Sequence, residues 1–383
     1  MQLSVIILNY NVRYFLELCV LSVQKAIQNL DAEIIVVDNN SSDDSCSMIK
    51  LRFPNIKLIE NNKNLGFPKG NNIGVARAKG EYICILNPDT VVAEDTFEKI
   101  LSFMSSRAQS WDDLGIVGCK LIDGTGNFLP ESKRGIPTPF VAFTKIFGLY
   151  KISNLFGKYY EQHLSQNQSG KVDILVGAFM VMKRELYNEI GGFDENCFMY
   201  SDDIDLSYMA LQKGKVNYYF AETTVIHYKG ESTIRDGLYM KRFQEAMQFF
   251  YKKHFNPEGS VLLIFDFFMR IGTILFSLIK KNQSKIVIRE IDEYVIFSKE
   301  ELQLNFTKKI TIFNIFSEFK NNLNCNIEII FDTKSFSFKE IIDFMSYNKS
   351  KNVTFKNYIP ISNYIIGSNN SIDRGEIFNL NNF

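Results

Sequence analysis

Short apolar runs alternate with helical segments over the first 90 residues, and this alternation limits the fold more than any other feature. Each of the runs at 3–10, 33–38, 56–62 and 82–90 contains a cluster of apolar residues that includes isoleucine, and the clusters in 3–10, 33–38 and 82–90 are nearly continuous. Helical stretches lie between them, at 13–29, 44–52 and 70–79. Strands that are apolar on both faces and separated by helices are typical of a parallel sheet covered by helices. The sequence therefore predicts an α/β fold.

Polar residues stand where several of these predicted strands end. They are Asn9, Asp38 and Asp89. Ligands of open α/β sheets bind beyond the carboxyl ends of the strands, so we expect a site there. A single aspartate after a strand is also commonly a helix N-cap or a turn former, and this interpretation stays open for Asp89 taken alone.

The segment 64–74 between these strand ends contains three glycines at four-residue spacing, Gly66, Gly70 and Gly74. The spacing is not GxGxxG and no GK[ST] occurs, so neither a dinucleotide fingerprint nor a P-loop is indicated. We expect a loop whose backbone can approach a ligand closely. It would lead into a helix N-terminus, which favours anions.

The pattern changes after residue 90. The following elements are expected: a strand at 174–183, a helix closed by Gly191 and Gly192, a helix ending near 213, a strand ending at His227, and a helix at 238–255. We predict one domain over 1–258 and a second, small α/β domain over 284–383. The apolar segment 259–283 between them carries Asp266 and Arg270, which makes crossing a bilayer costly. It is either a helix in the membrane interface or a helix that docks the domains.

Charge and cysteine content set further bounds. Lysine plus arginine equals aspartate plus glutamate at 43 each, and no basic run occurs, so we expect no nucleic-acid partner. The six cysteines are scattered without a CxxC pair, which favours reduced thiols in the cytoplasm. The N-terminus is apolar for only a few residues and lacks a basic lead-in, so we expect no signal peptide.

The stretch 199–208, "MYSDDIDLSY", places Asp202, Asp203 and Asp205 within four positions. Crowded carboxylates raise one another's proton affinity, as a general base requires. The other interpretation is that Asp202 caps the following helix and Asp205 is solvated. Both interpretations can hold for different members of the cluster.

Residues 2 to about 255 resemble the family 2 glycosyltransferases of the GT-A fold, especially the bacterial rhamnosyltransferase-like branch. Seven stretches carry the resemblance: "SVIILNYN", "IIVVDNNSSDDS", "NLGFPKGNNIG", "YICILNPDT", "VGAFMVMKRE", "IGGFDENCFMYSDDIDLSYMALQKG" and "IHYKGEST". Their order and separation make the match specific. It implies a mixed sheet flanked by helices, and an inverting transfer from a nucleotide sugar.

The resemblance also implies roles for single residues. Asn87 takes the place of the first aspartate of the family's DxD motif, which leaves Asp89 as the carboxylate on a divalent cation. His227 would be the second metal ligand; the alternative is a structural histidine at a strand end. Oxygen ligands suit Mg²⁺, and an imidazole favours Mn²⁺. The residues implied to hold the nucleotide are Asn9, Asn11, Asp38, Asn64, Gly66, Asn71 and Asn87.

On the acceptor side, the resemblance implies that Asp203 is the general base. Asp202 replaces the family's glutamate, and we expect it and Asp205 to cap the helix or orient the substrate. Gly177 and Ala178 are expected to shape the sugar pocket. Arg134 either reaches the acceptor or is a cation in a surface loop. Basic residues that could hold phosphate oxygens are Lys229, Arg235, Lys241 and Arg242.

These expectations combine into one hypothesis. It is an inverting, metal-dependent glycosyltransferase that moves a hexose such as rhamnose to a lipid-linked or polysaccharide acceptor, in peripheral contact with the inner face of the cytoplasmic membrane. A sugar nucleotidyltransferase would need a glycine-rich basic loop after the first strand, which "NYNVRYF" is not. A degenerate, non-catalytic scaffold would not be expected to keep the acidic and histidine residues together. The segment "IIGSNNSIDRGE" resembles Rossmann-like domains, so we expect a docking or regulatory role for 284–383.

Overall fold

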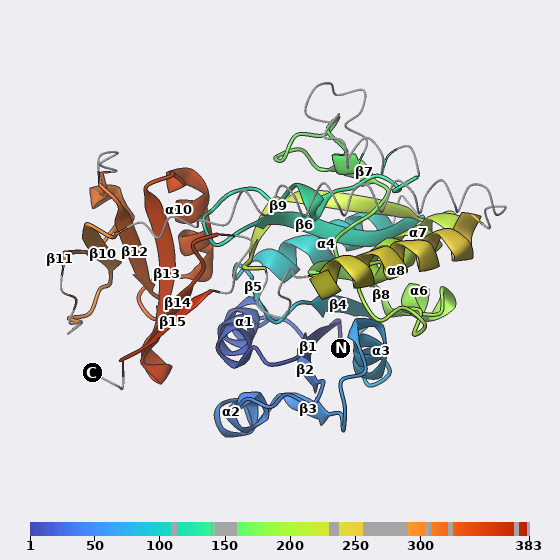
Figure 1. Cartoon of the computed structure of the whole chain (residues 1–383), viewed down its shortest axis with the longest axis horizontal. Coiled ribbons are helices and arrows are strands. Elements are labelled where there is room, and N and C mark those ends of the chain that lie inside the picture. Colours follow the sequence, from blue (N-terminus) through green and yellow to red (C-terminus); the bar gives the residue numbers. More distant parts are fainter. Residues whose placement is uncertain are drawn as a thin grey trace.

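Two β-sheets organise the chain, one with nine strands and one with six (Figure 1). The smaller sheet lies beside α1 (Arg13–Ala26) and β5 (Thr90–Val91) of the larger unit (Figure 1). This is a computed structural model. The residues that it describes are 1–108, 113–138, 141, 159–229, 237–255, 290–302, 306, 308–320, 325–370 and 375–380.

One half of the larger sheet is parallel, with strand order β3-β2-β1-β4. Its strands are β1 (Leu3–Asn9), β2 (Ala32–Asp38), β3 (Lys57–Glu60) and β4 (Tyr82–Leu86). The connecting helices are α1 (Arg13–Ala26), α2 (Ser45–Arg52) and α3 (Phe67–Val75). All seven residues of β1 are buried, because a central parallel strand is covered on both faces. The strands and helices expected here from the apolar pattern are confirmed.

The other half of the sheet is mixed. β8 (Phe179–Lys183) runs antiparallel to β4, while β6 (Leu114–Ile122) and β9 (Val216–His227) are parallel to each other. β5 (Thr90–Val91) and β7 (Gly170–Val172) pair antiparallel with β9. The helices of this half are α4 (Thr96–Ala108), α6 (Arg184–Glu189), α7 (Asp202–Gln212) and α8 (Gly237–Phe255). The mixed sheet flanked by helices is thus confirmed, whereas β6, β7 and α4 were not expected.

The glycine segment differs from its prediction. α3 begins at Phe67, so Gly70 and Gly74 lie inside the helix. A Cβ atom at Gly70 would lie 2.4 Å from Leu8 Cδ1, and one at Gly74 would lie 2.5 Å from Ile6 Cγ2. These two glycines therefore allow α3 to pack closely on β1 and β2, and the expectation that they let backbone approach a ligand is wrong. Gly66 alone remains in the loop, at a φ of +83°.

The smaller sheet has the strand order β11-β10-β12-β13-β14-β15, parallel from β11 to β13 and antiparallel beyond. Its elements are β10 (Glu293–Phe297), β11 (Lys309–Phe313), β12 (Ile327–Asp332), α10 (Phe338–Asn348), β13 (Val353–Ile359), β14 (Tyr364–Gly367) and β15 (Glu376–Asn379). The predicted small α/β unit is confirmed, and the exact domain limits stay a prediction. The predicted helix at 259–283 lies outside the described residues. Within the described part of the chain, no helix combines the length and hydropathy needed to cross a membrane.

The two sheets share a hydrophobic core. Phe15 on α1 and Ile226 on β9 belong to the same buried cluster as Phe331 on β12 and Phe338 on α10. Glu94 accepts hydrogen bonds from the first two backbone N–H groups of α10, at 2.8 Å each. An acidic side chain is favourable at a helix N-terminus, so this contact adds to the apolar docking.

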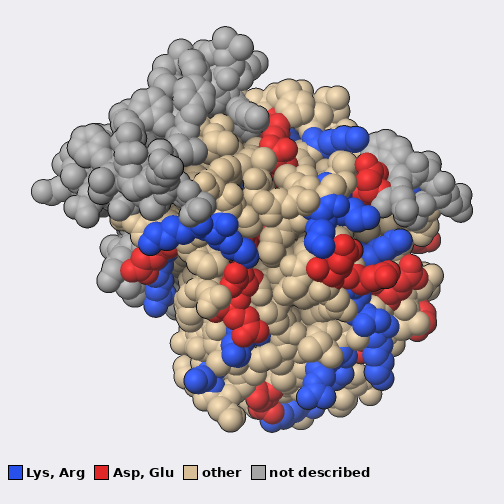
Figure 2. Space-filling view, turned by 90° about the vertical axis from the view of Figure 1, so that its right-hand side faces the viewer, with Lys and Arg blue, Asp and Glu red and all other residues tan. Residues whose placement is uncertain are grey.

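Charge and cysteine chemistry agree with the sequence. Acidic and basic side chains are intermixed on the face in Figure 2, and its described residues form no extended basic area. The six cysteines, all in the described part of the chain, form no disulfide bonds, in agreement with the expected reduced thiols.

Because α3 packs closely on the sheet, we expect a glycine-to-alanine substitution inside it to destabilise the folded protein instead of stabilising it. Gly→Ala inside a helix normally stabilises by up to about 1 kcal/mol. Gly74→Ala should instead destabilise, by about 1–3 kcal/mol, because the new methyl group meets Ile6. Urea unfolding monitored by circular dichroism measures the change.

The control is the double variant Ile6→Ala with Gly74→Ala. It should lose less stability than the sum of the two single variants, because removing the isoleucine branch makes room for the methyl group. A Gly74→Ala variant as stable as the wild type would show that α3 can move away from the sheet.

Candidate active site

The carboxyl ends of β1 and β2 form a preordered polar edge. Asn9 and Asp38 are partners in the parallel register. The Asn9 amide donates to Asp38 Oδ1 at 2.7 Å, and the backbone N–H of Ser41 donates to Asp38 Oδ2 at 2.8 Å. Asn11, at a φ of 56°, accepts a hydrogen bond from the backbone N–H of Ser42 at 2.7 Å. The structure therefore brings Asn9, Asn11 and Asp38 together on adjacent loops.

A second loop is tied to this edge through Asn39. The Asn39 amide donates to the carbonyl oxygen of Gly66 at 3.0 Å, and Asn64 Oδ1 accepts from the Gly66 N–H at 2.9 Å. Asn71 lies inside α3 and donates to the carbonyl oxygen of Phe67 at 3.0 Å. Asn39 was not among the predicted residues, although its place directly after Asp38 could have suggested it.

Asp89 and His227 meet where β5 pairs with the end of β9. Thr90 is the register partner of His227. His227 Nε2 lies 3.4 Å from Asp89 Oδ1 and 3.4 Å from the Asn87 amide nitrogen. Two buried atoms at this place, His227 Nδ1 and Asn87 Oδ1, have no hydrogen-bond partner among the described residues. Buried polar atoms are rarely left unpaired, so these atoms indicate a missing ligand or water.

The geometry fits a divalent cation. Ligands at about 2.0–2.2 Å from one metal ion lie roughly 3–3.6 Å from each other, which matches the Asp89–His227 separation. The described residues contain no group of three or more acidic, histidine or cysteine side chains that could hold a metal ion. Asp89 and His227 would therefore supply two of the ligands of such a cation and leave its other coordination positions open.

Asp203, in the first turn of α7, is held by two donors. Its Oδ2 accepts from Arg134 Nη2 at 2.7 Å and from the backbone N–H of Gly177 at 3.0 Å. Arg134 is only 8% exposed, so its interpretation as a surface cation is wrong. Burial opposes its charge, but the Asp203 carboxylate raises the pKa of the guanidinium above its ordinary value. Arg134 therefore orients Asp203.

The dipeptide Gly177–Ala178 connects the two halves of the site. Gly177 donates to Asp203, and the carbonyl oxygen of Ala178 accepts from the backbone N–H of Asn87 at 3.0 Å. A Cβ atom at Gly177 would lie 3.3 Å from Asp203 Cβ. Asp203 and the backbone of Asn87, two residues before Asp89, thus contact consecutive residues of one short segment before β8.

Asp202 is buried beside Asp203 and has a different environment. Burial, and then the charge of Asp203, raises the pKa of Asp202 to about 7. The helix begins at Asp202 itself, with Ser201 at the N-cap position, so the predicted capping role is wrong. Burial beside Asp203 therefore favours the protonated form of the Asp202 carboxyl group.

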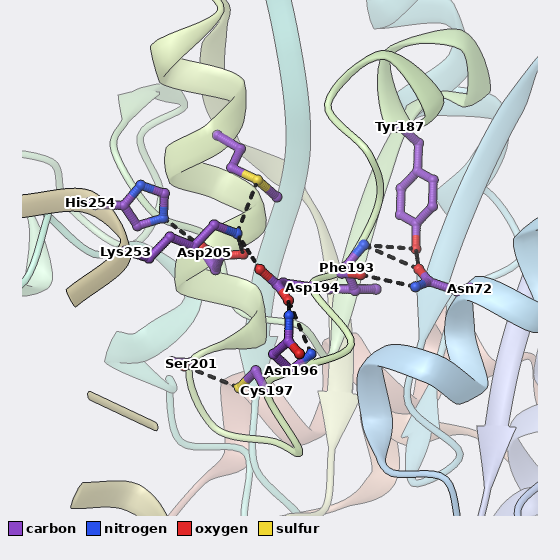
Figure 3. A network of polar contacts seen from close by, with 11 residues as sticks. Asn72, Tyr187, Phe193, Asp194, Asn196, Cys197, Ser201, Asp205, Lys253 and His254 are labelled. Carbon is purple, nitrogen blue, oxygen red and sulfur yellow. Dashed lines mark hydrogen bonds and ion pairs between the residues drawn. The ribbon is translucent and has the colours of Figure 1, made fainter. Parts of the chain in front are cut away.

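Asp205 belongs to a helix–helix contact (Figure 3). It is 1% exposed, its Oδ2 lies 2.8 Å from Lys253 Nζ, and its Oδ1 lies 2.5 Å from His254 Nε2. Lys253 also contacts Asp194 Oδ2, at 2.8 Å (Figure 3). Both oxygens are thus occupied by α8. These contacts contradict both expectations for Asp205, a solvated side chain and a substrate-binding one. The sequence predicted the helix α8, but not that it supplies the partners of Asp205.

The basic residues near the end of β9 are only partly described. Lys229 pairs with Glu131, and Arg242 lies over the Phe198 ring at 5.3 Å. Arg235 lies outside the described residues, as does the side chain of Lys241.

Comparisons with known proteins identify a family for the first half of the chain. Residues 4–191 match the model of the family described as "Glycosyl transferase family 2". The chain contains a family 2 glycosyltransferase domain. That domain holds every predicted nucleotide-binding residue and Asp89, whereas the acidic cluster and His227 follow it.

Rhamnosyltransferases are among the relatives of this glycosyltransferase. The chain is 25% identical over 214 residues to the N-acetylglucosaminyl-diphospho-decaprenol L-rhamnosyltransferase of Mycobacterium tuberculosis, covering 53% of this chain and 68% of that protein. It is 26% identical over 220 residues to the rhamnosyltransferase WbbL of Escherichia coli, covering 54% and 78%. Among solved structures, the mannosyltransferase PcManGT of Pyrobaculum calidifontis has a TM-score of 0.47 and 18% identity, covering 67% of this chain and 65% of that one.

The raised pKa of Asp202 predicts that stability depends on pH. The folded protein keeps this proton up to about pH 7, whereas the ordinary value is 3.8. The stability from this group is therefore fully present below the ordinary value and is lost as pH rises through about 7. Asp202→Asn removes the titration, so the melting temperature of the variant minus that of the wild type should increase from about pH 4 to about pH 8.

Scanning fluorimetry across the pH range measures this difference, at roughly 2 °C for each kcal/mol. Asp31→Asn is the control, because Asp31 is 67% exposed and its surface ion pair with the N-terminus is expected to add little to stability. A difference for Asp202→Asn that stays constant with pH would contradict the buried, protonated carboxyl group.

The Asp205 contact predicts a loss of stability. Asp205→Asn leaves Lys253 and His254 without their buried carboxylate, and we expect the free energy of unfolding to fall by about 3 kcal/mol at neutral pH. Asp194→Asn removes a more exposed partner of the same lysine and should cost less than about 1 kcal/mol. Equal losses in chemical denaturation would show that Asp205 has no special part in docking α8.

Proposed function

We propose that this protein is an inverting glycosyltransferase that depends on a divalent cation and uses a nucleotide sugar as its donor. The observation that carries the proposal is the Asp89–His227 pair, with two buried unpaired polar atoms beside it and Asp203 across the Gly177–Ala178 segment. These are the two functions that an inverting transfer needs. One part of the site binds the leaving group and screens its charge, and a part on the opposite side of the sugar holds the base that accepts the proton of the acceptor.

On the donor side, Asp89 and His227 would hold the cation. When bound, Mn²⁺ or Mg²⁺ neutralises the charge that develops on the departing nucleoside diphosphate. Asn87 would contribute its free Oδ1 to the same place. The residues that we assign to the nucleotide lie at the carboxyl ends of β1 and β2, in the loop before α3 and in α3 itself. They are Asn9, Asn11, Asp38, Asn64, Gly66 and Asn71.

On the acceptor side, Asp203 would accept the proton of the attacking hydroxyl group. Arg134 and the Gly177 N–H both bind Oδ2, and they leave Oδ1 without a hydrogen bond among the described residues. The carboxylate is thus held in one orientation with one oxygen available, which is the arrangement a general base requires. Asp202 is a second acid–base group at the same place, with a pKa of about 7.

We further propose a hexose such as rhamnose as the transferred sugar and a lipid-linked or polysaccharide hydroxyl as the acceptor. The support is the names of two relatives, both rhamnosyltransferases, one of which acts on a diphospho-decaprenol-linked sugar. A lipid-linked acceptor would bring the protein into peripheral contact with the inner face of the cytoplasmic membrane, where surface glycans are assembled.

A donor panel tests the proposal. Thermal shift with dTDP-, UDP- and GDP-sugars and Mn²⁺ identifies the donor, because a ligand that binds only the folded state raises the melting temperature. Transfer or hydrolysis of that donor is then measured. Asp203→Asn should lower kcat by about 10²–10⁴-fold and keep the thermal shift. Asp89→Asn should lose the part of the thermal shift that needs Mn²⁺.

Asp31→Asn is again the matched control and should behave as the wild type. An Asp203→Asn variant with wild-type activity would remove the assigned base. A chain that binds no nucleotide sugar would instead favour the non-catalytic scaffold.

A further inference from the structure

The end of β9 has two neighbouring side chains with different surroundings. His227 faces Asp89 and Asn87, whereas Tyr228 is 1% exposed and belongs to the core shared with the smaller sheet. Successive residues of an extended strand point to opposite faces, so the two side chains share one backbone segment but not one environment. Contacts that hold the Tyr228 side chain therefore also restrain the backbone next to His227.

Contacts from three directions hold the Tyr228 side chain. Its ring lies 5.0 Å from the Phe15 ring of α1, and its hydroxyl oxygen accepts a hydrogen bond from the Asn357 amide of β13 at 2.7 Å. Gly124 leaves room for it, since a Cβ atom there would lie 3.0 Å from Tyr228 Cδ1 and 2.6 Å from the carbonyl oxygen of Ser368. Asn357 lies in β13 and Ser368 directly follows β14, so the smaller unit packs directly on Tyr228 and on Gly124 beside it.

The backbone of Tyr228 also holds the partner of His227. Its N–H donates to the carbonyl oxygen of Asp89 at 3.0 Å. A movement of Tyr228 would therefore shift both members of the Asp89–His227 pair. Farther along the same segment, Glu94 accepts the first two N–H groups of α10. The chain that carries Asp89 is thus fastened to the smaller sheet at two points.

We infer that the smaller sheet is a positioning element of the candidate active site, acting through Asn357 and Tyr228 on the Asp89–His227 pair. This inference rests on the proposed function for the identity of the bound cation. It assigns the C-terminal unit a part in the reaction without any contact to substrate. Second-layer partners of metal ligands commonly have such a part, because they fix the orientation of the ligands.

Two variants test the inference from opposite sides of the contact. Tyr228→Phe removes the hydroxyl group and keeps the ring, and Asn357→Ala removes the donor. Each should raise the dissociation constant of Mn²⁺, measured by electron paramagnetic resonance with excess dTDP or UDP, on the order of tenfold. Because both variants break the Asn357–Tyr228 contact, the double variant should lose less Mn²⁺ affinity than the sum of the two single variants.

Tyr364→Phe is the matched control. Tyr364 is also a buried tyrosine in the contact between the units, and its hydroxyl donates to the carbonyl oxygen of Tyr14 at 3.1 Å. Tyr364→Phe also removes a hydroxyl group at the boundary between the two units, but the hydrogen bond that is lost is one to α1 and not one to the end of β9. The dissociation constant of Mn²⁺ should stay within about twofold of the wild-type value.

A measurement without metal or nucleotide accompanies the titration. Amide exchange of the segment 225–229 in the metal-free protein should be faster in Tyr228→Phe and Asn357→Ala, and unchanged in Tyr364→Phe, because the Tyr228 N–H bonds to Asp89. Wild-type Mn²⁺ affinity in both test variants, or an equal loss in Tyr364→Phe, would overturn the inference. If the wild type itself binds no Mn²⁺ with either nucleotide, the proposed function fails, and the exchange comparison alone decides whether the smaller sheet positions this strand end.

Discussion

The pairing of β5 with the end of β9 is the interaction on which the site depends. It is a two-residue pairing, Thr90 with His227 and Val91 with Ile226, extended by the hydrogen bond from Tyr228 to Asp89. Through it a carboxylate that follows β4 meets an imidazole from much later in the chain. So short a ladder cannot be stable alone, and it is kept in place by the cores on either side of the sheet.

The three aspartates of α7 illustrate how neighbouring identical residues acquire different chemistry. Asp203 bonds with Arg134 and a backbone N–H, Asp205 is neutralised by α8, and Asp202 is buried next to another negative charge. The pKa of a carboxyl group follows from burial and from the nearest charges, and here these differ from one residue to the next. One acidic run therefore contains a hydrogen-bonded carboxylate, a buried carboxyl group with a raised pKa and a structural ion pair.

The shared core makes the smaller sheet more than an appendage. Apolar side chains of α1 and β9 are buried against β12 and α10, so folding of the larger unit and docking of the smaller one stabilise each other. Polar contacts at the same boundary, from Asn357 to Tyr228 and from α10 to Glu94, fix the position of one unit against the other. These contacts connect the smaller unit to the end of β9, where Asp89 and His227 meet.

Local pattern was enough for the parallel half of the sheet and for the polar residues at its strand ends. An apolar run shows its period and its end within a few residues, so Asn9, Asp38 and Asp89 could be assigned to strand ends from the apolar pattern alone. The family resemblance then added predicted roles for Asp203 and His227. β6, with two glycines inside it, gave no comparable signal. The roles of Gly70, Gly74, Arg134 and Asp205 depended instead on the fold. Each is set by a partner distant in sequence, since Ile6, Asp203 or Lys253 becomes a neighbour only when strands and helices pack, and no local period records which segments will meet.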